Sequence, residues 1–166
     1  PLFKEVLGAY DNSLAAINLR RVEARTSDLG VLLVNRYYAD MSATGQIVQE
    51  LSEDLAAYGA DVTVLTGSLR YEDSALVPGR NEVTTAGVHV VRIAPTHFGR
   101  STYLNRVMDH VFFYSTTLFW LLRAPRQGFS HIVAFTDPPL IALIGALGRR
   151  LKRWKFVYGV QDLYPE

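Results

Sequence analysis

The chain contains no cysteine among its 166 residues. Disulfide scaffolds and cysteine-ligated zinc sites are therefore excluded, and the composition suits a reducing compartment such as the cytoplasm. A dominant charge of one sign is also lacking, because 17 lysine and arginine residues oppose 16 aspartate and glutamate residues. The formal net charge of +1 provides no general attraction to nucleic acid, so we expect no nucleic-acid partner.

Long apolar runs are missing as well. The most membrane-like stretch, residues 110–122, is shorter than the roughly 20 residues that a spanning helix needs. The first residues lack the apolar core of a signal peptide. We therefore expect a cytoplasmic protein that is soluble or bound peripherally at the inner face of the cell membrane.

Several sequence fingerprints are absent. No pair of the four histidines has the spacing of metal ligands, so we expect no metal site. The sequence has no G-x-G-x-x-G motif, no Walker lysine and no G-x-S-x-G elbow. These absences argue against a dinucleotide-binding domain, a P-loop enzyme and a serine hydrolase.

The sequence does contain apolar runs that alternate with amphipathic segments. The runs predict strands at residues 31–35, 62–65, 88–93, 131–135 and 155–160. Helices are predicted at residues 45–58, 102–122 and from Pro139 to about residue 153. This alternation predicts an α/β fold, a Rossmann-like three-layer αβα domain whose parallel sheet has the strand order 3-2-1-4-5.

Two segments fall outside this alternation. Residues 1–28 have apolar residues at helical spacing and are predicted to form an appended N-terminal helix, so the Rossmann-like domain spans residues 29–166. Residues 67–87 are polar and rich in turn-forming residues, and they are predicted to be a surface excursion.

The predicted strand order places a topological switch point between the first and fourth strands, and ligands bind beyond the carboxyl ends of strands at such a point. Residues 36–45, 136–139 and 161–166 are the loops that converge there. Thr44 and Gly45 begin a helix in the first loop, where free N–H groups favour a phosphate. The alternative is a helix that is simply capped by a serine or threonine.

Two aspartates follow strands at the same edge. Asp137 stands between the fourth strand and two prolines, where it either caps the next helix or contacts a sugar hydroxyl. Asp162 follows the fifth strand, where it is either a general base, an acceptor-positioning carboxylate or a turn residue.

Two features indicate contact with an anionic membrane surface. The helix at residues 102–122 carries aromatic residues around most of its circumference. Five of the seven residues from 149 to 155 are basic. The membrane-facing candidates in this cluster are Arg149, Arg150, Lys152, Arg153 and Trp154. The alternatives are a helix buried on several sides and basic residues that favour the end of a helix dipole.

Four motifs resemble family 4 retaining glycosyltransferases. Residues 37–46 (YYADMSATGQ) resemble the family's "YYPPD-x-x-ATGQ" loop, and residues 51–64 match its "L-x-x-DLA-x-x-G-x-x-VTV" helix and strand. Residues 135–140 (FTDPPL) resemble the "TSPPL" loop, and residues 162–166 (DLYPE) the "DLWPE" motif, of the fucosaminyl-transferase-like branch in surface-polysaccharide synthesis.

The resemblance implies the N-terminal, acceptor-side half of a GT-B enzyme without a cofactor or metal. The C-terminal domain that binds most of the nucleotide-sugar donor is then absent, and this chain alone is expected to bind but not to turn over. The partners are that domain, a lipid-linked or sugar acceptor and the membrane. The resemblance implies that the loop with Gly45 touches the donor diphosphate. The candidate catalytic residues are Asp137 and Asp162. The candidate donor-diphosphate or acceptor contacts are Asp40, Thr44, Gly45, Gln46, Thr136 and Glu166.

An alternative function uses the same features without catalysis. The chain is then a Rossmann-like subunit that binds a catalytic partner or anchors it at the membrane. A third class, an unrelated nucleotide-binding domain, lacks its phosphate fingerprints here and gives no reason for the DLYPE motif.

Overall fold

The computed structural model describes residues 29–77, 81–93, 102–138 and 140–161. Strands and helices alternate through most of this range, as the sequence predicts. The strands are β1 (Gly30–Val34), β2 (Asp61–Gly67), β3 (Asn81–Val83), β4 (His89–Ile93), β5 (His131–Phe135) and β6 (Lys155–Gly159). The helices are α2 (Ala43–Ala57), α3 (Tyr103–Arg123) and α4 (Ile141–Lys152). The predicted helix at residues 1–28 lies outside the described residues.

The strands form one sheet in the order β3-β4-β2-β1-β5-β6. All neighbours are parallel except β3 and β4. The predicted order 3-2-1-4-5 corresponds to β4-β2-β1-β5-β6 and is confirmed. The prediction that residues 67–87 are only a surface excursion is wrong in part, because β3 lies within them. All three residues of β3 are exposed, so this edge strand has no apolar alternation that could reveal it.

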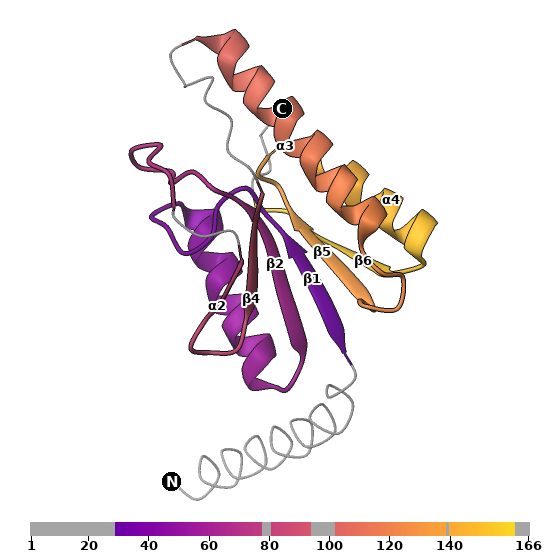
Figure 1. The fold of residues 1–166 in the computed structure, drawn as a ribbon. Helices are drawn as coiled ribbons and strands as arrows, with labels where there is room; N and C mark the ends of the chain where they lie inside the picture. The colour runs from indigo at the N-terminus through magenta and orange to yellow at the C-terminus, as the bar shows by residue number, and fades with distance from the viewer. Residues whose placement is uncertain (1–28, 78–80, 94–101, 139, 162–166) are drawn as a thin grey trace, which may run out of the picture.

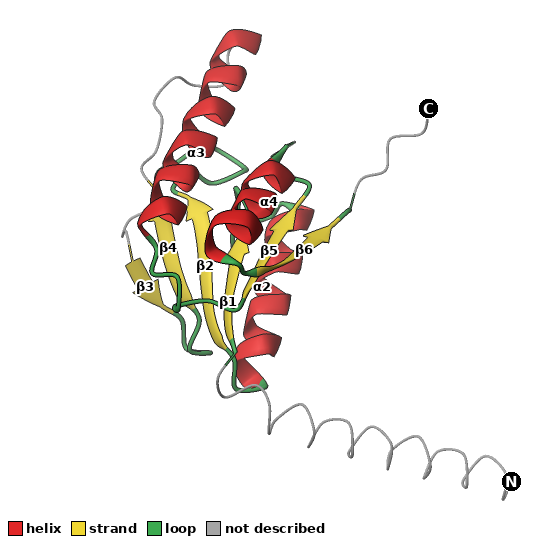
Figure 2. Ribbon diagram, turned by 90° about the vertical axis from the view of Figure 1, so that its right-hand side faces the viewer, coloured by secondary structure: helices red, strands yellow, loops and turns green. Residues whose placement is uncertain are grey.

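Helices cover both faces of the sheet, so the domain has three layers. Helix α2 lies on one face, and α3 and α4 lie on the other (Figures 1 and 2). Alternate residues of β1 supply the two cores. Val31 and Leu33 pack in the cluster that contains Val48 of α2, whereas Leu32 and Val34 pack in the cluster on the face of α3 and α4. Burial on both faces explains why β1 is a continuous apolar run.

Helix α3 packs through one narrow face and exposes the opposite one. Residues spaced four apart, Asp109, Phe113, Thr117 and Leu121, are buried. The opposite face carries exposed apolar side chains, and its N-terminal part extends past the carboxyl ends of the strands (Figure 1). We call this face the α3 stripe; it comprises Leu104, Met108, Val111, Phe119 and Leu122. No helix in the described part of the chain is long and apolar enough to cross a membrane.

The basic segment at the end of α4 is partly structural. Trp154 is only 2% exposed, its indole Nε1 donates to the Arg126 carbonyl at 3.0 Å, and its ring packs edge-on against Phe129. The prediction that Trp154 faces a membrane is therefore wrong, because the indole belongs to the core. The Lys152 ammonium donates to two carbonyl oxygens at the end of α3, at 2.8 and 2.7 Å. The side chains of Arg149, Arg150 and Arg153 are exposed.

Candidate functional site

A cavity of about 310 Å³ opens at the topological switch point, beyond the carboxyl ends of β1 and β5. The segment after β1 contributes Arg36 and Tyr37, and the segment after β5 contributes Asp137. Tyr71 comes from the excursion after β2. The first half of α3 supplies Arg106, Asp109 and His110. We call this space the switch-point cavity.

One wall of the switch-point cavity is held by an ion pair between β1 and α3. The Arg36 guanidinium lies 3.6 Å from the Asp109 carboxylate, which is buried in the ridge of α3 that faces the sheet. The guanidinium also lies over the ring of Tyr37, 5.5 Å from its centre. Tyr37 in turn packs edge-on against Tyr71, with ring centres 5.3 Å apart. Two aromatic rings and a fixed cation therefore line one side of the cavity.

Asp137 supplies a carboxylate on the other side. Its backbone carbonyl accepts a hydrogen bond from the Arg36 N–H at 3.4 Å, which joins the ends of β5 and β1. The N-cap position of α4 belongs to Leu140, so Asp137 does not occupy the capping position that one interpretation of the sequence gave it. The side chain lines the cavity instead.

Asp137 also acts electrostatically on Tyr114 of α3. Burial first, and the negative charge of Asp137 second, raise the pKa of Tyr114 to about 12, although the positive charge of Arg36 opposes the shift. The phenol therefore stays protonated near neutral pH, where it can both donate and accept hydrogen bonds.

Buried polar atoms without partners gather near the same edge. Asn35, Thr136 and Gln161 follow β1, β5 and β6, which are neighbours in the sheet. Asn35 Oδ1, Thr136 Oγ1 and Gln161 Oε1 are buried and have no hydrogen-bond partner among the described residues. An unsatisfied buried polar group costs about 1–3 kcal/mol. This edge therefore favours contact with further polar groups.

The start of α2 is capped by a serine, which is one of the two alternatives that the sequence predicted. Ser42 is the N-cap residue, and its hydroxyl accepts from the Gly45 N–H at 3.0 Å. The Asp40 carboxylate accepts from the Ser42 N–H at 3.1 Å, so these two side chains leave the N–H groups of Ala43 and Thr44 in the first turn unengaged. A serine-capped helix is thus confirmed, whereas phosphate binding at this turn stays a prediction.

The side chains around Gly45 leave no room for a Cβ atom at this position. A Cβ atom at this position would come within 2.6 Å of Ser42 Oγ and still closer to Asp40 Oδ1. A larger residue would therefore disturb the loop before α2 whether or not a diphosphate binds there. Thr44, Gly45 and Gln46 do not line the switch-point cavity.

The structure brings together part of the predicted site. Thr136 and Asp137 lie at the switch point, whereas Asp40 lines a second cavity beside it. Asp162 and Glu166 lie outside the described residues. In the described part of the chain, no group of three acidic or histidine side chains could hold a metal ion.

The residues that α3 and the excursion after β2 contribute to the switch-point cavity were not predicted from the sequence. Asp109 is the one charged residue in the buried face of α3, and its spacing of four from Phe113 was the available signal. Arg106 and His110 lie close to it on the same helix. Tyr71 lies in a polar segment without periodicity, and no local pattern points to it.

Comparison with known proteins gives one family match. A family model described as a glycosyl transferase 4-like domain matches residues 42–166, which is more than half of the chain. No curated protein matches the chain.

Proposed function

Because the chain belongs to the glycosyl transferase 4-like family, we propose that it is the acceptor-binding N-terminal domain of a retaining GT-B glycosyltransferase. The enzyme transfers a sugar from a nucleotide-sugar, held mainly by a C-terminal domain, to a lipid-linked acceptor. Its products belong to bacterial surface polysaccharide, in the manner of the fucosaminyl-transferase-like branch. The observation that carries this proposal is the switch-point cavity, which combines aromatic rings, arginines and a carboxylate.

Each type of residue in the cavity has a role toward a sugar linked to diphosphate. The rings of Tyr37 and Tyr71 pack against the apolar face of a sugar. Arg36 and Arg106 supply positive charge for the diphosphate of the acceptor. The Asp137 carboxylate accepts a hydrogen bond from the acceptor hydroxyl and orients it for attack. That hydroxyl oxygen bonds to the anomeric carbon and passes its proton to the Asp137 carboxylate, while the bond between the anomeric carbon and the nucleoside diphosphate breaks.

In this proposal the donor diphosphate contacts the first turn of α2 and the segment after β5. The N–H groups of Ala43 and Thr44, which have no partner among the described residues, suit a phosphate oxygen. Thr136 Oγ1, which has no partner among the described residues, is available for a further hydrogen bond. Asp162 and Glu166, which lie outside the described residues, are proposed as further contacts to the substrates.

A titration followed by backbone amide NMR tests the assignment. The ligands are a short-chain polyprenyl diphosphate-sugar and a panel of nucleotide-sugars. We expect the lipid-linked sugar alone to shift the amides near Arg36 and Asp137. Asp137→Asn should weaken this binding, whereas Asp73→Asn, at an exposed aspartate in the excursion, should not. Saturable binding of a nucleotide-sugar alone would contradict the division between acceptor and donor domains.

The α3 stripe provides the membrane contact of the proposed enzyme. The first half of α3 lines the cavity with Arg106 and His110 and exposes Leu104 and Met108 to solvent. Its only carboxylate, Asp109, is buried, so the exposed face carries no negative charge. An acceptor headgroup in the cavity therefore has its lipid chain beside an apolar, non-acidic surface, as at an anionic membrane interface.

Sedimentation with anionic vesicles tests this contact. Leu104 is 68% exposed on the stripe, and Leu76 is 53% exposed in the excursion after β2. We expect Leu104→Asp to weaken vesicle binding and the matched Leu76→Asp to leave it unchanged. Charge reversal at Arg149, Arg150 and Arg153 measures how much this basic cluster contributes to vesicle binding. Equal binding of the native chain and Leu104→Asp would remove α3 from the membrane contact.

A further inference from the structure

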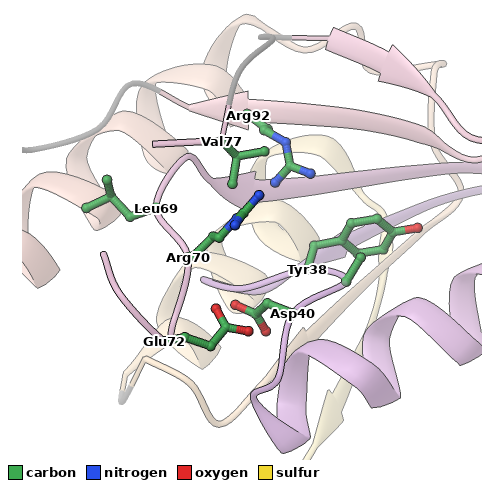
Figure 3. Close-up of a pocket in the computed structure, with 8 residues that line it drawn as sticks. Tyr38, Asp40, Leu69, Arg70, Glu72, Val77 and Arg92 are labelled. Atoms are coloured by element: carbon green, nitrogen blue, oxygen red, sulfur yellow. The ribbon is translucent and has the colours of Figure 1, made fainter. Parts of the chain in front are cut away.

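A second cavity of about 250 Å³ lies beside the switch-point cavity, between the loop after β1 and the excursion after β2 (Figure 3). The two cavities share these walls. Tyr37 and Tyr71 line the first, whereas their sequence neighbours Tyr38, Arg70 and Glu72 line the second. We call this second space the arginine cavity because two guanidinium groups enter it.

The first guanidinium group belongs to Arg92 on β4. This residue is only 9% exposed, and its one ion pair joins Nη2 to the Glu82 carboxylate at 2.7 Å. Its Nε atom is buried and has no hydrogen-bond partner among the described residues. A buried charged group retains an unused donor only at a free-energy cost, so the cavity favours a ligand oxygen at this position.

Arg70 supplies the second guanidinium group from the excursion. Figure 3 shows the Arg70 and Arg92 side chains both directed into the cavity. Among the described residues Arg92 pairs with Glu82, and no ion pair joins Arg70 to an acidic side chain. The carboxylates of Asp40 and Glu72 line the same cavity, so the attraction of an anion here rests on the directed donors of the two arginines and not on net charge.

The two carboxylates of the arginine cavity already accept hydrogen bonds from backbone N–H groups. Asp40 accepts from the Ser42 and Tyr71 N–H groups at 3.1 and 3.2 Å, and Glu72 accepts from the Met41 N–H at 2.7 Å. They therefore tie the two walls together. The unused hydrogen-bonding capacity consists mainly of arginine donors, with a smaller capacity to accept hydroxyl protons.

We propose that the arginine cavity is an acceptor subsite for an acidic sugar unit. Its carboxylate or phosphate oxygens bind Arg92 Nε and the Arg70 guanidinium, and its hydroxyls donate to Asp40 and Glu72. The inference rests on the proposed function, since it places a second sugar unit of the acceptor beside the one in the switch-point cavity. It adds that the acceptor carries negative charge on the saccharide as well as on the lipid phosphate.

The test is an amide NMR titration of the whole chain with small probes. The probes are methyl β-D-glucuronide, methyl β-D-glucoside, glucose 6-phosphate and inorganic phosphate. We expect the two charged sugars to shift the amides of Leu69, Arg70 and Arg92, with the neutral glucoside at least about tenfold weaker. The tighter of the two charged sugars identifies a carboxylate or a phosphate. Inorganic phosphate that binds as tightly as glucose 6-phosphate would overturn the assignment to a sugar.

Variants separate this proposal from a general attraction of anions. Arg70→Gln changes an exposed side chain and should weaken the binding of the charged sugar about tenfold, whereas Arg126→Gln, at an exposed arginine after α3, should have no effect. Arg92→Gln is a second variant, to be compared at equal folded fraction. Native-like binding by Arg70→Gln, or equal binding of glucuronide and glucoside, would overturn the proposal. Shifts confined to Arg36 and Asp137 would retain the proposed function alone, and no shift in either cavity would count against both.

Discussion

Gly45→Ala is expected to destabilise the domain although it improves the intrinsic helix propensity of α2. Alanine is favoured over glycine within a helix by about 1 kcal/mol. The new methyl group would, however, displace the Asp40 carboxylate, which accepts hydrogen bonds from Ser42 and Tyr71. Hydrogen bonds to charged groups contribute about 1.5–3 kcal/mol each. The loss of one or two of them leaves a net destabilisation of about 1–4 kcal/mol.

A double-mutant cycle isolates this cause. In the Asp40→Ala background the carboxylate is absent, so Gly45→Ala should cost less than in the native background, and the remaining cost comes from the contact of the methyl group with Ser42 Oγ. The coupling between the two positions is then about 1–3 kcal/mol. Urea unfolding followed by circular dichroism gives the free energy of unfolding for each variant. Asp73→Ala serves as the control background, in which the effect of Gly45→Ala should be unchanged.

Two results would refute the reasoning. Gly45→Ala could prove neutral in the native background, or it could cost the same with and without Asp40. Either result would mean that the carboxylate does not occupy the space required by the methyl group. A functional effect of substitution at Gly45 could then be attributed to diphosphate binding rather than to a disturbed loop.

Further predictions concern the core and the charged groups. Leu121→Ala should lower the free energy of unfolding in urea by about 3–5 kcal/mol, because this side chain is fully buried. Leu104→Ala on the α3 stripe should change it by less than about 0.5 kcal/mol. Equal losses in the two variants would contradict the packing of α3. Burial first, and a nearby lysine second, lower the pKa of His131. The unfolded chain then binds the proton more tightly, so stability falls as the pH drops below about 6.5, and His131→Gln should reduce that slope. Lys152→Met should cost about 1–3 kcal/mol, because it leaves two carbonyl oxygens at the end of α3 without their donor. Arg149→Met, at an exposed position, should have little effect on thermal unfolding.

The sheet could be predicted because its strands are local apolar patterns. Val31 to Val34 form a continuous run, since both faces of a central parallel strand are buried. The edge strand β3 could not be predicted in this way. Its residues Asn81 to Val83 are exposed and are held by antiparallel pairing with β4, which is a tertiary contact. The predicted order of the other strands survives because connections between parallel strands follow strict handedness.

The candidate site was predictable only where it follows a strand. Asp137 and Thr136 could be placed at the switch point, because a residue after a parallel strand lies at the carboxyl edge of the sheet. Tyr71 could not, because its position depends on a hydrogen bond to Asp40, 31 residues away. Trp154 was wrongly assigned to the surface. Arg153 adopts a left-handed conformation with φ of 63°, and after this C-cap turn the buried indole packs against Phe129 and donates to the Arg126 carbonyl.

The wall that the two cavities share constrains which substitutions, insertions and deletions this domain can accept. In the segments after β1 and β2, successive residues face opposite cavities, as Tyr37 and Tyr38 do, and as Arg70 and Tyr71 do. Replacing one of these side chains alters one compartment and spares its neighbour. Inserting or deleting a single residue would exchange aromatic and charged groups between compartments. We therefore expect substitutions in these two segments to change one cavity at a time. We expect insertions and deletions in them to disrupt both cavities.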